Sequence, residues 1–328
     1  MSSRTTAIAI TVLLVLVAAL LPLWMGPFFT RVIQLFFFSA ALAVAWNILG
    51  GFSGYWSFGH AAFIGMGAFS AAHLVAQLGP FGSGPWSMVV PVLAAGLICG
   101  VFAAIIAYPI LRLRGIYFAI AMLGVSQVVG ELVNNVRWFQ GGTGVFLQSP
   151  VPAGMRPEVF YYYIFGALLL LGFLISVAVR NARFGYALFA IREDEDTAMM
   201  LGVATERYKI MAFVLSATLV GMLGAVYGYS VGYLTTYTVF RLDFSLNMIV
   251  FCLIGGIGTL YGPIIGTAIM LFITQVLLSR FLDMHLLITG AIVVTIILLM
   301  PGGVIGAFNS LRRKSSDQAN TTRAEAAR

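Results

Sequence analysis

Apolar residues dominate this chain in long blocks, which short polar or glycine-rich stretches separate. A window of about 20 residues, the length of helix that crosses a bilayer, distinguishes ten such blocks. They lie at 6–25, 32–49, 58–78, 88–110, 116–133, 160–179, 210–231, 244–257, 260–278 and 286–300. The pattern predicts an all-α polytopic membrane protein with about ten transmembrane helices (8–10). The blocks at 244–257 and 286–300 are short, so we expect tilted helices or half-helices there.

The composition excludes a soluble domain. Hydrophobic residues make up 61% of the 328 residues, charged residues 9%, and the mean hydropathy is +1.00. A soluble domain of this length could not cover so much apolar surface. Both cysteines, Cys99 and Cys252, lie inside apolar blocks, so neither a disulfide framework nor a thiolate metal site is indicated. The block at 6–25 is interpreted as a retained first transmembrane helix.

Basic residues predict the orientation in the membrane. With ten spans and a cytoplasmic N-terminus, thirteen of the 18 Lys and Arg residues lie inside and five outside, as the positive-inside rule requires. Both termini and the segment 180–209 are therefore predicted to be cytoplasmic, and residue 145 external. Residues 1–308 are expected to form one transmembrane domain, followed by a disordered cytoplasmic tail at 309–328.

The segment 180–209 is the one heavily charged interruption of the apolar pattern, with five basic and five acidic residues. This balance argues against a basic patch for lipid or nucleic acid. Residues 184–201 are predicted to form one helix that Gly202 ends in a left-handed cap, and Thr205 is predicted to be the N-cap of the next helix. The segment is either a docking site for a cytoplasmic partner or a solvated connection between spans.

Two glycine-dense stretches, 50–67 and 255–266, interrupt or end apolar blocks. Backbone groups freed by glycine and proline at membrane depth are tolerated where they are buried in protein or line a wet cavity, as in transporter paths. Close packing through small residues is the alternative interpretation, and one surface can do both. The candidates for the translocation path are Asn47, His60, Gly255, Gly256, Gly262 and Pro263.

Other polar groups within the spans are few. Glu131 is a functional candidate by its type, but it lies near the outer end of its span and can also reach water. Motifs of hydrolases and metalloenzymes are absent, and so is a Walker A loop. The sequence thus predicts neither an enzyme nor a metal or cofactor site, and any ATP hydrolysis is expected on another polypeptide.

Several motifs in their order resemble one family. They are Leu111–Ile120 (LRLRGIYFAI), Gly141–Gly144 (GGTG), Ala190–Asp194 (AIRED) with Ala198, Gly202 and Arg207–Lys209, and Gly255–Gly256 through Gly262–Pro263. Together they resemble the permease subunit of branched-chain amino-acid ABC importers, LivM type, over nearly the whole chain. The resemblance implies a multi-pass protein of the bacterial inner membrane, in contact with lipid and not with nucleic acid. It also implies a LivH-like second permease, two cytoplasmic ABC ATPases and a periplasmic binding protein as partners.

The resemblance places the ATPase-coupling segment in the charged stretch. The residues concerned are Arg192, Glu193, Asp194, Glu195, Asp196, Ala198, Met199, Leu201 and Gly202. The full EAA signature of other importers is missing, and Asp196-Thr197-Ala198 stands where it is expected. The implied substrate is a branched-chain or other hydrophobic amino acid, with urea or a short amide as the alternative. A self-contained secondary transporter is the competing class, against which the scarcity of intramembrane acids argues.

Overall fold

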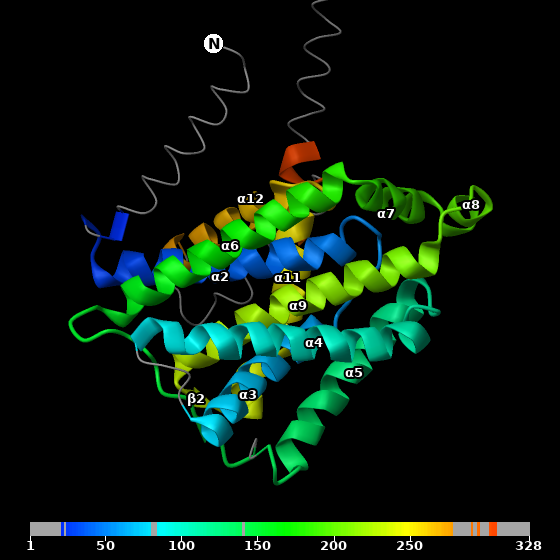
Figure 1. The fold of residues 1–328 in the computed structure, drawn as a ribbon. Helices are drawn as coiled ribbons and strands as arrows, with labels where there is room; N and C mark the ends of the chain where they lie inside the picture. The colour runs from blue at the N-terminus through cyan, green and yellow to red at the C-terminus, as the bar shows by residue number, and fades with distance from the viewer. Residues whose placement is uncertain are drawn as a thin grey trace, which may run out of the picture.

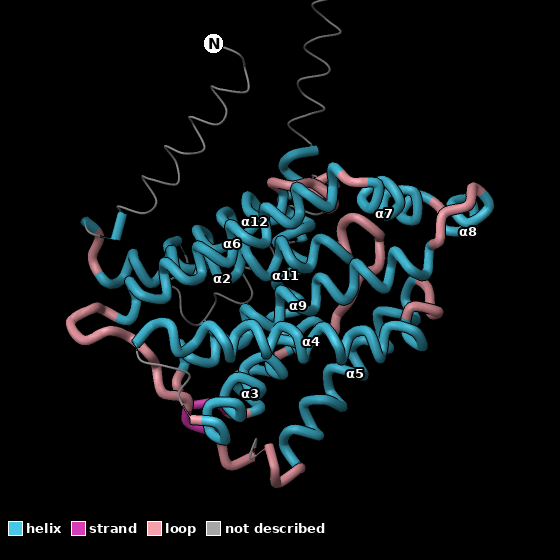
Figure 2. Tube along the Cα trace, in the orientation of Figure 1, coloured by secondary structure: helices cyan, strands magenta, loops and turns pink. Residues whose placement is uncertain are grey.

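The computed structural model of the chain describes residues 21–22, 24–79, 84–139, 142–277, 290, 294–295 and 302–306. Helices make up most of this part, as the apolar pattern predicts (Figure 2). The α-helices are α2 (Pro27–Leu49), α3 (His60–Leu78), α4 (Val89–Ile110), α5 (Gly115–Asn135), α6 (Pro157–Asn181), α7 (Arg183–Glu193), α8 (Glu195–Met200), α9 (Thr205–Val231), α10 (Thr236–Val239), α11 (Leu242–Gly255) and α12 (Gly262–Leu271). A 3-10 helix (Gly84–Met88) precedes α4, and a π-helical turn (Phe272–Leu277) follows α12.

Seven helical segments in the described residues are long and apolar enough to cross a membrane. They are Pro27–Leu49, His60–Leu78, Trp86–Ile110, Gly115–Asn135, Pro157–Asn181, Thr205–Val231 and Thr236–Gly255. The predicted span at 260–278 is represented by a shorter apolar helix, Gly262–Gln275. The predicted spans at 6–25 and 286–300 lie mostly outside the described residues, so the count of about ten stays a prediction.

Helix α9 is the centre of the bundle (Figure 1). Helices α3 and α4 pack against one side of α9, and α2 and α6 lie on the other side with α12 beyond them. Small residues allow these helices to approach closely: a Cβ atom at Gly67 of α3 would lie 2.1 Å from the carbonyl oxygen of Gly221 in α9. In the best apolar windows of α2 and α9, 61% of residues are buried, against 28% in those of α5 and α6. The last two helices therefore leave much apolar surface for lipid or other subunits.

The connections gather at two opposite ends of the bundle. One end carries α7, α8 and the loops at 50–59, 111–114 and 256–261. The other end carries the short antiparallel pair β1 (Val145–Phe146) and β2 (Tyr233–Leu234). Residues 145 and 195 thus lie at opposite ends of the molecule, and which of these ends faces the cytoplasm stays a prediction.

The segment predicted as one helix at 184–201 is two helices, so that prediction was wrong. Asp194 separates α7 from α8 with an extended backbone (φ −160°, ψ 115°), and its carboxylate accepts a hydrogen bond of 2.6 Å from the Thr197 N–H. This bond and a further one from the Thr197 side chain hold the pKa of Asp194 below its usual value. An aspartate competes with the helical backbone in this way and favours an N-cap, which explains the break.

The predicted cap at Gly202 is confirmed. Gly202 has a φ of +86°, and the N–H groups of Gly202 and Val203 donate to the carbonyl groups of Met199 and Ala198. The predicted N-cap was wrong by one residue, since Ala204 is the N-cap of α9 and makes no side-chain cap bond. A tight turn, in which the Thr205 N–H donates to Val203, starts the helix at Thr205 itself.

Cysteine labelling can test which end faces the cytoplasm. We expect Met200→Cys to react with a membrane-impermeant maleimide only from the cytoplasmic side, and Phe146→Cys only from outside. Met200 and Phe146 are 85% and 82% exposed, so a failure to react would not come from burial. Comparison of intact cells with inverted vesicles gives the measurement. Labelling of Phe146→Cys from the cytoplasm would contradict the predicted topology.

Candidate functional site

Helix α8 ends in an exposed apolar tip made of Met199, Met200 and Leu201. These residues are 50%, 85% and 79% exposed, and they lie at the end of the bundle that carries α7 (Figure 1). The left-handed turn at Gly202 follows directly and sends the chain back into α9. Large apolar side chains on a polar connecting segment are typical of a protein contact site. The tip is thus accessible to a partner, and its role as a docking surface stays a prediction.

A buried charged cluster holds α8 against the bundle. Lys209, near the start of α9, is 2% exposed. Its ammonium group donates to Glu195 at 2.6 Å, to the Tyr55 hydroxyl at 2.9 Å and to the Leu111 carbonyl at 3.0 Å. The Tyr55 hydroxyl donates in turn to the second Glu195 oxygen at 2.5 Å. We call Lys209, Glu195, Tyr55 and the Leu111 carbonyl the Lys209 cluster. Through it α8 contacts α9, the 50–59 loop and the end of α4.

All three N–H groups of the Lys209 ammonium have an acceptor, which is the condition under which a buried ion pair persists. Burial, and next the hydrogen bond to Glu195, raise the pKa of the Tyr55 hydroxyl. Tyr55 therefore stays protonated and acts as a donor to the carboxylate. A second contact lies at the surface, where Arg114 bonds Asp196 at 2.9 Å with both side chains at least half exposed. That surface pair contributes little by itself.

The two glycine-dense stretches meet beside α7. The Asn47 side chain donates to the Thr259 carbonyl at 2.9 Å and accepts from the Gly258 N–H at 3.0 Å. Arg192 of α7 donates to the Gly51 carbonyl at 2.8 Å, and its guanidinium lies against Gly258. The predicted residues Asn47 and Arg192 thus connect two loops that are about 200 positions apart in the sequence. We call this contact the glycine junction.

The glycines of the second stretch serve close packing. A Cβ atom at Gly255 would lie 1.7 Å from the Gly262 carbonyl oxygen, and one at Gly266 would lie 1.9 Å from that of Phe251. Gly262 and Pro263 form the first turn of α12, where proline loses no helical hydrogen bond. The contact between α11 and α12 therefore requires glycine, whether or not the same residues also line a path. Gly256 ends α11 with a φ of +120°.

His60 lies at the start of α3 with no exposed surface. Its Nδ1 is 2.9 Å from the Ser57 hydroxyl and its Nε2 is 2.8 Å from the Ser216 hydroxyl. Ser216 donates further to the Ala45 carbonyl at 2.7 Å. His60 thus ties the first glycine stretch to α9 and α2. A role for His60 in the path stays a prediction.

Comparison with known families decides the assignment. The family described as the permease component of the branched-chain amino acid transport system matches residues 28–298. The chain belongs to this family. The chain is accordingly a multi-pass permease subunit of the inner membrane, as the sequence motifs predicted.

Individual relatives agree with the family match. The chain is 27% identical over 293 residues to the high-affinity branched-chain amino acid transport system permease protein LivM of Escherichia coli K12, covering 80% of this chain and 67% of the relative. It is 25% identical over 295 residues to LivH of Salmonella typhimurium, covering 81% and 91%. The autoinducer 2 import system permease protein LsrC of Klebsiella pneumoniae is 27% identical over 189 residues, covering 56% and 52%. No solved structure matches this one.

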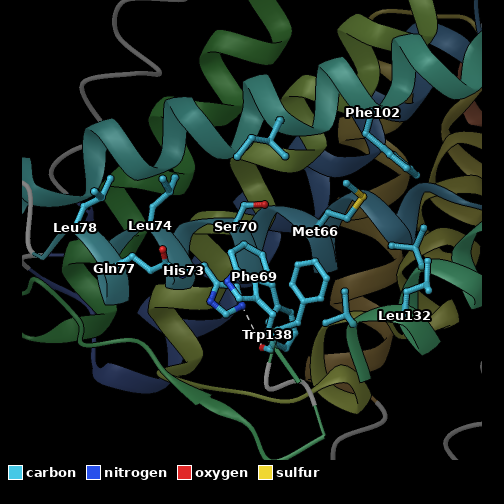
Figure 3. A pocket seen from close by; sticks show the side chains of 14 residues that line it. Met66, Phe69, Ser70, His73, Leu74, Gln77, Leu78, Phe102, Leu132 and Trp138 are labelled. Atoms are coloured by element: carbon cyan, nitrogen blue, oxygen red, sulfur yellow. Dashed lines mark hydrogen bonds between the residues drawn. The ribbon is translucent and has the colours of Figure 1, made fainter. Parts of the chain in front are cut away.

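The permease also contains an apolar cavity that its sequence did not predict. The cavity of about 540 Å³ lies between α3, α4, α5 and residues 138–139 (Figure 3). His73 lines this cavity, its Nε2 atom donates a hydrogen bond to the Phe139 carbonyl at 3.1 Å, and its ring stacks on that of Trp138 with 4.8 Å between the ring centroids. Because most lining side chains are aliphatic or aromatic, the cavity offers few polar partners to a charged substrate.

Sequence reasoning did not predict the roles of Lys209 and Tyr55. Lys209 is one of two lysines in the chain, and it stands at the border of an apolar block. A lysine in that position is a signal for a buried pair, but its partner is 14 residues away and the tyrosine 154 residues away. Reasoning from the sequence therefore grouped Glu195 with the exposed acids beside it.

Proposed function

We propose that this permease subunit forms part of the translocation path of an ABC importer for branched-chain or other hydrophobic amino acids. Separate cytoplasmic ATPases supply the energy. The family match and the LivM and LivH relatives support the substrate class. The LsrC relative, an autoinducer 2 import permease by its name, indicates that related proteins also carry other solutes.

The main support for an ATPase partner is that α8 exposes an apolar tip while an ion pair anchors the same helix to the bundle. Met200 is 85% exposed, whereas Glu195 of the same helix is anchored by the buried Lys209. An ATPase that binds this tip would move α8 and, through the Lys209 cluster, the start of α9 together with the 50–59 loop. The glycine junction would pass the displacement from α7 to the 256–261 loop. Alternating access would then follow from a change between two packings of these helices.

The partners follow from the same surfaces. Helices α5 and α6 expose much of their apolar surface within this chain, which suits a LivH-like second permease and lipid. The opposite end, with β1 and β2, would face a periplasmic binding protein. The proposed assembly contains two permeases, two ATPases and one binding protein. The proposed path residues around Asn47, His60 and the second glycine stretch lie at the α7 side of the bundle and would form its cytoplasmic part.

A single charge in the apolar tip tests the docking assignment. We expect Met200→Glu to reduce co-purification of the ATPases by about tenfold or more, because a buried Met contributes about 1.5–3 kcal/mol to a contact. The permease should still fold, since Met200 is exposed in the subunit. Phe146→Glu is the matched control, because it adds the same charge at an equally exposed apolar position of the opposite end. Equal recovery of ATPase with both variants would contradict docking at α8.

A further inference from the structure

A second, polar pocket lies at the end of the bundle opposite α8. Its volume is about 230 Å³, and it is lined by the outer half of α5, by α10 and by the start of α11. One carboxylate, Glu131, and one guanidinium, Arg241, line the same pocket. Asn134 and Thr236 add an amide and a hydroxyl, and the Phe240 ring adds an apolar surface. A positive and a negative group beside an apolar wall are what an amino acid zwitterion requires.

Neighbouring contacts hold these groups in place. The Asn135 side chain donates to the Glu131 carboxylate at 3.0 Å, and the Thr236 hydroxyl donates to Asn134 at 3.1 Å. The Phe240 ring lies tightly against Gly65 of α3, where a Cβ atom would be 2.4 Å from the ring. The apolar wall is therefore fixed by packing, and a ligand need not order it.

Arg241 keeps donors for a ligand. Its Nε and Nη2 atoms bond one oxygen of Asp243 at 3.3 and 2.7 Å, and both side chains are more than half exposed. Such a pair contributes little to stability but orients the guanidinium plane. An arginine carries five N–H donors, so a ligand carboxylate can bind the edge that Asp243 does not occupy.

The pocket opens on the exposed stripe of α5. The residues Tyr117, Ile120, Gly124, Gln127 and Glu131 are spaced by three or four positions and are all exposed, so they form one face along the whole helix. Nothing in the described residues lies within 4 Å of a Cβ atom built at Gly124. A solute bound at Glu131 thus has an uncovered helix face in front of it that leads toward the α8 end.

We propose that this pocket binds the charged groups of the amino acid as it enters the path. Glu131 and the side-chain oxygen of Asn134 receive the α-ammonium group, and the guanidinium group of Arg241 receives the α-carboxylate. The aliphatic side chain lies on Phe240. The inference rests on the proposed function. It means that the permease itself recognises both charged groups of the amino acid, in addition to any recognition by the binding protein.

Transport by the complete importer in proteoliposomes tests the pocket. We expect Glu131→Gln and Arg241→Gln each to lower leucine uptake by about tenfold, the loss typical of one charge-assisted hydrogen bond. Arg137→Gln and Glu158→Gln, which remove like charges near the same end but outside the pocket, should keep uptake within about twofold. If the wild type transports leucine and both pocket variants do so equally well, the proposed binding pocket is contradicted but the proposed function is not. Absence of leucine uptake by the wild type would instead contradict the proposed function.

Protection from labelling measures binding apart from transport. In the purified complex without binding protein, leucine should slow maleimide labelling of Gln127→Cys, a position that is exposed and lines the pocket. Isovaleric acid and isoamylamine each carry only one of the two charged groups and should protect less. Adding Arg241→Gln should reduce leucine protection to the level of isoamylamine. Equal protection by all three compounds, or none by leucine, would overturn the proposal.

Discussion

A Lys209→Met variant is expected to lose coupled uptake and about 3–5 kcal/mol of stability, because the change leaves a buried carboxylate without its counter-charge. Glu195 keeps only 11% of its side chain exposed, and Arg114 is 3.8 Å away on its solvent side. The neutral Tyr55 hydroxyl cannot replace the lost ammonium. Thermal unfolding of the purified subunit and leucine uptake by the complete importer give the two measurements.

The control for this variant is Arg207→Met, which removes an exposed positive charge two residues earlier on α9. It should leave the unfolding temperature nearly unchanged. The double variant Lys209→Met/Glu195→Gln should regain much of the stability, because no buried charge remains. Its uptake should stay low if the ion pair transmits the motion of α8. Wild-type stability and uptake in Lys209→Met would contradict the role assigned to the Lys209 cluster.

A Gly266→Ala variant is expected to fold poorly, because the new methyl group would meet backbone instead of a movable side chain. Its Cβ atom would lie 1.9 Å from the Phe251 carbonyl oxygen and 2.8 Å from the Gly255 N atom. Separation of α11 from α12 is the one way to relieve this contact, at a cost of about 1–3 kcal/mol or more. The yield of monodisperse protein and its unfolding temperature measure the effect.

Gly124→Ala is the matched control, since it makes the same substitution in a transmembrane helix where a Cβ atom meets nothing within 4 Å. Its unfolding temperature should equal or slightly exceed that of the wild type. Equal behaviour of the two alanine variants would show that α11 and α12 are not packed as closely as described. Close packing would then not explain the second glycine stretch, and lining of the translocation path would be the remaining interpretation.

The two contacts beside α8, through which we propose that the permease couples to an ATPase, consist of different kinds of group. The Lys209 cluster is buried and charged, so its separation is costly and α8 should move together with the start of α9. The glycine junction consists of hydrogen bonds to loop backbone from Asn47 and Arg192. Such bonds can be exchanged with others at small net cost. The junction is therefore the better place for a change of conformation.

The features that could be predicted from the sequence are those that depend on neighbouring residues and on composition. The apolar blocks placed seven of the spans close to their observed bounds, because the length of a membrane helix is set by the bilayer. The cap at Gly202 was predictable because only glycine adopts that backbone conformation without strain. The break between α7 and α8 was also predictable in principle, because aspartate is a favoured N-cap residue. Asp194 is the N-cap of α8 and divides the predicted helix in two.

Which polar groups contact one another could be seen only once the helices were placed in space. Glu195 stands between two acids in the sequence, yet its side chain is largely buried and bonds to Lys209 and Tyr55. The neighbouring Asp196 instead pairs with Arg114 at the surface. The pairing of Asn47 with Gly258 spans 211 positions, and the pocket that contains Glu131 and Arg241 joins α5 to the start of α11. Helical periodicity says which residues share a face of one helix, but it does not say which faces of two helices pack together. That choice depends on the fit of side chains across the whole bundle.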